Sequence, residues 1–324
     1  MNIPTLKTNA ADCLSAAPYS PRKLALLHSG AAVAVSLLLT LVNFLLTRQM
    51  DATSGLSGIT TRAVLSFIQT MLMLVATVAM PFWEFGFYRA ALNLSRREPA
   101  GPATLLSGFR RFGVVLRLFL LRTGLAIGIT FACLQAATIL FMLSPWSEMS
   151  MVTAEQLLAS GDALDETAIA QMMQTMYPVY ILFAVLLCVS LLPILYRFRL
   201  ADWAVMDDTP KALRAMGLSS YWMHGRRKWL FRLDLSFWWY YALMSLSSLL
   251  AYGDLLLPAF GVPLNKDLAF FGFYLLSAAV QLLTAWRFAP QVQTTYALAY
   301  DALRAEKPQI QTPQPKPSPW EAEN

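Results

Sequence analysis

The segment Leu118–Leu143 reads LFLLRTGLAIGITFACLQAATILFML and contains a single charged residue, Arg122. A helix needs about 20 mostly apolar residues to cross the roughly 30 Å hydrocarbon core of a bilayer. This segment is long enough and apolar enough to do so. It therefore predicts one membrane-spanning helix.

Five further stretches of the chain have the same character. The whole chain is 57% hydrophobic and only 14% charged, whereas soluble domains carry about 25% charged residues. We therefore predict an all-α fold, a polytopic membrane helix bundle with about six transmembrane helices, together with short interfacial amphipathic helices. The other five predicted spans are Leu24–Leu46, Val64–Tyr88, Pro178–Leu200, Leu230–Leu256 and Leu268–Ala289. Residues 1–306 form this domain, and the Pro-rich residues 307–324 are predicted to be a disordered cytoplasmic tail.

The basic residues alternate between the two sides of this topology. Cytoplasmic flanks of membrane proteins carry an excess of Lys and Arg. Of the 25 Lys and Arg residues, 21 lie in the N-terminal segment, the second and fourth loops and the C-terminal segment, while the opposite side holds only Arg48, Arg62 and Lys266. This distribution predicts a multi-pass protein of the cell membrane with cytoplasmic N- and C-termini. It also explains the basic pI of 9.3 without nucleic-acid binding.

The second and fourth loops are both predicted to contain short helices. Thr209 is a candidate N-cap with Pro210 as the first helical residue, and Gly225 suits the C-terminal stop. In the second loop, Leu105, Phe109 and Phe112 form one stripe. Such helices can lie in the headgroup layer of a bilayer or simply cap the bundle. The candidate contacts with anionic lipid headgroups are Arg110, Arg111, Trp222, Arg226, Arg227 and Lys228.

Three ionisable residues lie within or close to the predicted spans: Glu84, Arg122 and Asp234. Charges inside a bilayer are costly and usually face the protein interior or water. We therefore predict an intramembrane charge cluster, in which Arg122 pairs with Glu84 or Asp234. A structural ion pair and a substrate or proton path are both open interpretations.

The third loop, residues 144–177, is acidic and has no Lys or Arg. It contains a capping box at Thr153–Gln156 and a Met stripe. An acidic lid that attracts cations, a Met-rich copper site and ordinary packing are the three interpretations. No His/Cys spacing resembles a metal site, and no nucleotide-binding or hydrolase motif is present. We therefore expect no metal, no cofactor and no catalytic residue.

The segment YRFRLADWAVMDDTPKALRAMGLSSYWMHGRRKWLFRLDLSFWWYY carries a family pattern. The matching positions are Tyr196, Asp208, Pro210, Ala212, Leu213, Ser219, Met223, Gly225, Trp229, Phe231, Asp234, Ser236, Phe237 and Trp238. The pattern resembles that of an uncharacterised family of bacterial membrane proteins, the domain of unknown function nine-seven-five. The closing segment APQVQTTYALAYDAL is similar, although Gln291 stands where the family often has an aromatic residue. The resemblance implies a multi-helix membrane protein and supplies no activity.

Two classes of function remain. The first is a non-enzymatic membrane protein that scaffolds or supports processes of the cell envelope. The second is a permease or exporter component for an ion, a lipid or an amphipathic molecule. The expected partners are the lipid bilayer and its anionic headgroups, with another membrane protein or a second copy of the chain as further candidates. A repeat at an offset of 112 residues, which relates Pro81 to Pro193, also stays open.

Overall fold

The computed structural model describes residues 2–52, 56–148, 166–207, 209, 211–253 and 266–306. All regular secondary structure in these ranges is helical, and they contain no strand, so the all-α prediction is confirmed. The chain divides into two compact units. The first comprises Met1–Leu116 and Leu200–Asn324, and the second comprises Arg117–Arg199.

Among the described residues, four helices are long and apolar enough to cross a membrane. They are α2 (Pro21–Ala52), α3 (Leu56–Ser95), α6 (Phe112–Met142) and α8 (Glu166–Arg197). By length and composition, the candidate spans are Pro21–Met50, Thr60–Ser95, Phe112–Met142 and Tyr177–Asp207. They cover the first four predicted spans, and the fourth range continues from α8 into α9 (Ala201–Asp207).

The fifth predicted span is not one continuous helix. The structure divides it into α11 (Arg227–Leu235) and α12 (Trp238–Leu250), with a break at Ser236 and Phe237. The Ser236 hydroxyl donates to the carbonyl of Leu233 at 2.6 Å. Lys7 donates to the Ser236 carbonyl at 2.6 Å, and its Nζ lies 4.0 Å from the centre of the Phe237 ring. A cation at a helix C-terminus stabilises it, so Lys7 favours the ending of α11 at this point.

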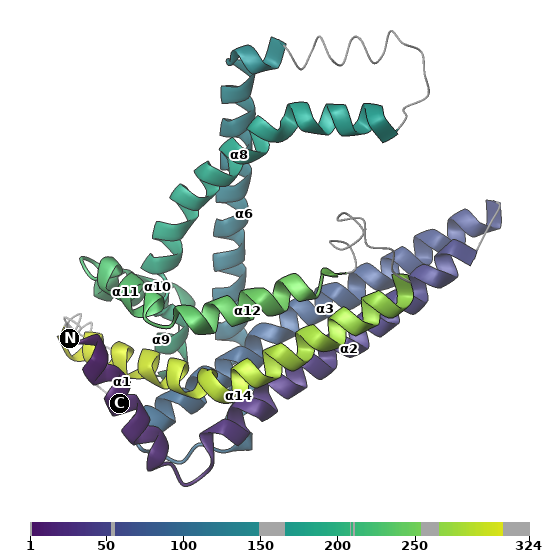
Figure 1. Ribbon diagram of the computed structural model, residues 1–324. Helices are drawn as coiled ribbons and strands as arrows, with labels where there is room; N and C mark the ends of the chain where they lie inside the picture. The colour runs from purple at the N-terminus through teal and green to yellow at the C-terminus, as the bar shows by residue number, and fades with distance from the viewer. Residues whose placement is uncertain are drawn as a thin grey trace, which may run out of the picture. The chain divides into compact units, whose positions relative to one another are not determined.

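The sixth predicted span belongs to a longer helix, α14 (Lys266–Glu306). Pro290 lies inside α14 and does not end it, so the helix continues beyond Ala289, where the predicted span ended. A proline in a helix interior removes one backbone hydrogen bond, and the packing of α14 against its neighbours compensates for this loss. In Figure 1, α14 lies along α2, α3 and α12 in the first unit.

An N-terminal helix, α1 (Ile3–Ser15), packs on α14 and α3. We did not predict it. Its buried residues are Leu6, Ala10 and Cys13, a spacing of four and then three that is typical of one helical face. The Cys13 thiol lies 3.5 Å from the Ser95 carbonyl at the end of α3. The N-terminal segment is therefore a packed element of the first unit.

The second loop forms two short helices, α4 (Pro102–Leu105) and α5 (Ser107–Arg110), which pack closely on α3. A Cβ atom on Gly86 would lie 1.8 Å from the Leu105 carbonyl oxygen. A Cβ atom on Gly108 would lie 1.9 Å from the Phe82 carbonyl oxygen. Only glycine at both positions allows this approach of the two backbones.

The fourth loop contains α10 (Ala212–Met223), so the predicted helix is present. Its N-cap is Lys211, without a side-chain hydrogen bond, which corrects the prediction that Thr209 caps the helix. Gly225 adopts φ +76°, as its expected role in the C-terminal stop requires. Leu213 is 71% exposed and lies outside the buried face of the helix. That face consists of Ala212, Ala215, Ser219, Trp222 and Met223.

Some predictions concern residues that the structure does not describe. The capping box at Thr153–Gln156 and the tail 307–324 lie outside the described residues. Only the backbone of the Met stripe in the third loop is described, because that stretch belongs to α8. The acidic-lid and copper interpretations therefore stay predictions.

Candidate functional site: an arginine–aspartate network

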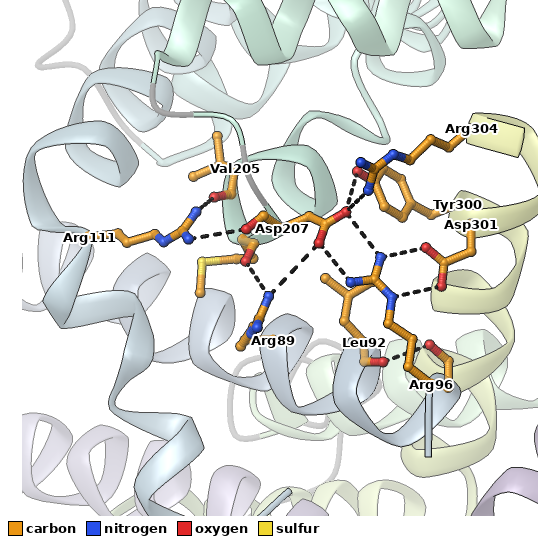
Figure 2. Close-up of polar contacts among 11 residues, drawn as sticks. Arg89, Leu92, Arg96, Arg111, Val205, Asp207, Tyr300, Asp301 and Arg304 are labelled. Atoms are coloured by element: carbon orange, nitrogen blue, oxygen red, sulfur yellow. Dashed lines mark hydrogen bonds and ion pairs between the residues drawn. The ribbon is translucent and has the colours of Figure 1, made fainter. Parts of the chain in front are cut away.

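Arg96 follows the last residue of α3 and lies between two carboxylates (Figure 2). Its Nη1 and Nη2 atoms donate to the two carboxylate oxygens of Asp207 at 2.7 and 3.0 Å. Its Nε and Nη2 atoms donate to Asp301 on α14 at 3.1 and 2.6 Å. The planar guanidinium fork matches the geometry of a carboxylate. Arg96 therefore joins the end of α3 to α9 and to α14.

Asp207, the last residue of α9, is the centre of these contacts. Its side chain is only 4% exposed. Besides Arg96, it accepts hydrogen bonds from the Tyr300 hydroxyl at 3.2 Å and from Arg304, and Arg89 Nη1 lies 4.0 Å from its Oδ1 atom. A buried carboxylate is stable only when its charge and lone pairs are compensated. These four side chains provide that compensation.

Two arginines also bind the backbone at the end of α9. Arg89 donates to the Met206 carbonyl at 3.0 Å. Arg111 donates to the carbonyl of Asp207 at 3.1 Å and to the carbonyl of Val205. The last carbonyls of a helix lack partners within the helix, so these guanidiniums satisfy groups that α9 leaves open.

We call this set the arginine–aspartate network. It consists of Arg89, Arg96, Arg111, Asp207, Tyr300, Asp301 and Arg304, all in the first unit. Four guanidiniums face two carboxylates, which leaves an excess of positive charge. Hydrogen bonds from Arg96 to Asp207 and then to Asp301 raise the pKa of Arg96 above its ordinary value. Burial, followed by the charge of Asp207, raises the pKa of Tyr300. Both groups keep their protons at neutral pH, so the network suits binding and positioning better than proton transfer.

The predicted intramembrane charge cluster is distributed over three helices. Glu84 lies on α3 with an exposed side chain, and Asp234 lies half-buried on α11. Asp234 accepts a hydrogen bond from Tyr296 of α14, whose hydroxyl is 2.9 Å from that of Tyr241. Arg122 lies on α6 in the second unit. The pairing of Arg122 with Glu84 or Asp234 stays a prediction.

The candidate headgroup contacts occupy different environments. Arg110 and Lys228 are exposed, and Arg226 and Arg227 are half-buried, with Arg226 in an ion pair with Glu306. Arg111 belongs to the network described above.

Trp222 differs most from the expectation. It is only 1% exposed, and its ring packs edge-on against Tyr300 at a centroid distance of 5.5 Å. Trp222 is therefore a packing residue that supports the network from α10, rather than a surface residue in the headgroup layer.

A second polar feature is a cavity of about 220 Å³ between α2, α12 and α14. Its polar lining includes Ser36, Tyr274, Ser277 and Gln281. The Ser247 hydroxyl donates to the Ser277 carbonyl at 3.0 Å, and the Ser277 hydroxyl donates to the Ser247 carbonyl at 2.7 Å. The hydroxyls of Ser36 and Tyr274 are hydrogen-bonded to each other. Uncharged hydroxyls thus join three helices in an otherwise apolar region.

Neither polar feature was predicted. The basic residues of the network were interpreted as topology signals, and Arg111 also as a candidate headgroup contact. The available clue was the presence of Asp207 and Asp301 in segments that otherwise carry many Arg residues. In the part of the chain that the structure describes, no group of three or more His, Cys, Asp or Glu residues could hold a metal ion.

Comparisons with known proteins add no relative. No family model, no curated protein and no solved structure matches this chain. The function is therefore inferred from the residues and their geometry.

Proposed function

We propose that this chain is a six-span protein of the cell membrane, with cytoplasmic termini, that supports the cell envelope without catalysing a reaction. The distribution of Lys and Arg favours this topology. Its packing also favours it: α14 packs against the candidate spans α2 and α3, and α12 packs against α14. A helix that packs lengthwise on a spanning helix can share its membrane layer. In this topology the fifth span is the predicted segment Leu230–Leu256, which includes most of α11 and all of α12, the sixth span lies within α14, and α10 lies at the cytoplasmic surface.

The arginine–aspartate network is the observation that carries the proposed role. It connects the end of α3, the end of α9 and the last turns of α14. In the proposed topology these three ends all lie on the cytoplasmic side. Its guanidiniums bind carboxylates and carbonyls of the same chain, so the network holds the ends of the spans together. This is the kind of internally satisfied polar network that specifies one arrangement of helices.

The family resemblance is part of the proposal. The break between α11 and α12 falls at Ser236 and Phe237, two positions of the family pattern. We propose that the chain is a member of that uncharacterised family, in which a multi-helix membrane domain is the common property.

The alternative function is a permease or exporter component for an ion, a lipid or an amphipathic molecule. The cavity between α2, α12 and α14 is the observation that favours it. Its hydroxyls lie among apolar helices, and polar groups inside a membrane domain often mark a transport path. Ser247 and Ser277 would then contact the transported molecule.

Proteoliposomes that contain the full-length protein distinguish the two functions. The assay measures proton flux with an entrapped pH dye and lipid movement with a fluorescent phosphatidylglycerol. The support function predicts the same rates as in protein-free vesicles. Transport by the protein that falls in the Ser277→Val variant and not in the Ser248→Val control would overturn the support function and establish the alternative. Ser248 also lines the cavity, but its hydroxyl donates to Met244 of the same helix.

A further inference from the structure

A cavity with two arginines lies where α1, the start of α2 and α14 meet. Its volume is about 450 Å³, within the range of about 300–1,000 Å³ that is typical of small-molecule sites. Arg22 of α2 and Arg287 of α14 both line it. Among the described residues that line it, none is Asp or Glu.

The guanidinium groups of Arg22 and Arg287 can bind an anionic ligand. Within the described part of the chain, neither Arg22 nor Arg287 forms an ion pair with a carboxylate. Both side chains are exposed, and each lies near an aromatic ring: Arg22 lies 5.5 Å from the centre of the Trp286 ring, and Arg287 lies 5.6 Å from that of Phe288. This differs from the network at Asp207, where every guanidinium binds a group of the protein.

The other polar groups of the cavity suit a phosphate. Ser15, Ser20 and Gln291 add two hydroxyls and an amide to its lining. The Ser15 hydroxyl already donates to the Asp12 carbonyl at 2.8 Å, so Ser20 and Gln291 are the donors that this proposal uses. Arginine forks bind phosphate oxygens in pairs, and hydroxyl and amide donors can satisfy the remaining oxygens. Two positive charges without a carboxylate favour an anion over a zwitterion or a cation.

The position of the cavity in the fold indicates where its ligand comes from. Pro21 is the first residue of a candidate membrane span, so Arg22 lies at the boundary of that span. Trp286 is exposed beside Arg22, and exposed Trp residues gather at the membrane–water interface. A lipid phosphate occupies this same layer.

We propose that this cavity binds the phosphate of an anionic lipid headgroup, with Arg22 and Arg287 as its two cationic ligands. The inference depends on the proposed membrane crossing of α2, and it does not depend on the support function. A phosphate ester in solution shares the same recognising chemistry, so the test must separate the two sources.

The test is native mass spectrometry of the full-length protein released from micelles that contain phosphatidylglycerol. The measured quantity is the dissociation constant of the first bound lipid. The double variant Arg22→Gln with Arg287→Gln should raise this dissociation constant about tenfold or more, because it removes two charge-assisted contacts. The control variant Lys23→Gln with Arg97→Gln removes two exposed charges outside the cavity, and it should change the constant less than about twofold.

Two further arms keep the outcome decisive. Inorganic phosphate at the same concentration as the lipid should leave lipid binding unchanged; displacement of the lipid at that concentration would assign the cavity to a soluble phosphate compound and overturn the lipid assignment. Equal weakening of lipid binding in both double variants, or no weakening in Arg22→Gln with Arg287→Gln, would overturn the site itself. If the double variant does not fold, the single variants Arg22→Gln and Arg287→Gln are measured in its place. Failure of the membrane topology would be detected separately, by cysteine labelling.

Discussion

Arg96 and Asp207 are 111 residues apart in sequence, yet they form two parallel hydrogen bonds of 2.7 and 3.0 Å. Asp207 is nearly inaccessible to solvent, and Arg96 keeps about a quarter of its side chain exposed. Removal of Asp207 would take the shared carboxylate from Arg304 and leave Arg96 with Asp301 alone. The stability of the first unit should therefore depend on Asp207 more than on any exposed carboxylate.

The first prediction concerns Asp207→Asn. The variant keeps the size of the side chain and removes its charge, which leaves Arg96 and Arg304 without their common anion. We expect a loss of about 3 kcal/mol in the free energy of unfolding. The measurement is denaturant unfolding in detergent. Asp12→Asn, an exposed carboxylate on α1, is the control and should change stability by less than about 0.5 kcal/mol. Equal losses in the two variants would contradict a structural role for the network.

The second prediction concerns pH and Tyr300. Burial and the charge of Asp207 raise the pKa of Tyr300, so the folded state favours the neutral phenol. The stability that this provides is complete below the unfolded pKa of about 10 and is lost as pH rises through the folded pKa. Tyr300→Phe lacks this titration and also lacks the 3.2 Å hydrogen bond to Asp207.

At pH 8 the thermal midpoint of the wild type should therefore be higher than that of Tyr300→Phe, by an amount that corresponds to about 1 kcal/mol in the free energy of unfolding. The difference should shrink steadily above pH 10. The comparison cancels the titration of the other tyrosines, which both proteins share. A difference that grows with pH would show that the phenol of Tyr300 ionises more easily in the folded protein.

The third prediction concerns the close approach of α3 to the second loop. Gly86→Ala would place a Cβ atom 1.8 Å from the Leu105 carbonyl oxygen, so the backbones must separate. We expect a loss of about 3 kcal/mol or more. Gly217 of α10 has open space around it, and Gly217→Ala should stabilise the protein by about 0.5–1 kcal/mol. Thermal unfolding of both variants checks the prediction; the same sign of change in both would refute the close crossing.

The fourth prediction separates packing from headgroup binding at Trp222. Because Trp222 is buried on Tyr300, Trp222→Ala should cost about 3–5 kcal/mol. Trp239 is exposed on α12, so Trp239→Ala should have a much smaller effect on stability in detergent. Trp222 fluorescence should also resist quenching by acrylamide in a variant that retains only this tryptophan. Ready quenching by acrylamide would show that Trp222 is exposed at the surface and would contradict its packing role.

The sequence-based predictions were accurate where the residues that determine a feature are close together in the sequence. The first four spans are uninterrupted apolar runs such as Leu118–Leu143, and each corresponds to an apolar helix in the structure. The break at Ser236 could not be predicted, because Lys7, 229 residues away, contacts its carbonyl. Likewise, the sixth predicted span ended at Ala289, but α14 continues past Pro290 and packs against distant helices.

The candidate site was missed for the same reason. Asp207 binds Arg96 and Arg304, which are 111 and 97 residues away in sequence. No periodicity joins residues at such distances, and each arginine also fits the charge pattern of a cytoplasmic flank. In contrast, the buried face of α1 could have been recognised from the spacing of Leu6, Ala10 and Cys13.

In the proposed topology the chain crosses the membrane six times. Four spans and six spans both leave the termini cytoplasmic, but they place the segment between α12 and α14 on opposite sides. The most direct measurement is the labelling of Asn265→Cys in intact cells with a membrane-impermeant maleimide, in a variant whose native cysteines are replaced. Ser160→Cys is the control for the outer side, and Leu213→Cys is the control for the cytoplasmic side. Six spans predict that Asn265→Cys is labelled as readily as Ser160→Cys, while Leu213→Cys is labelled only after permeabilisation. Labelling of Asn265→Cys only after permeabilisation would contradict the six-span topology.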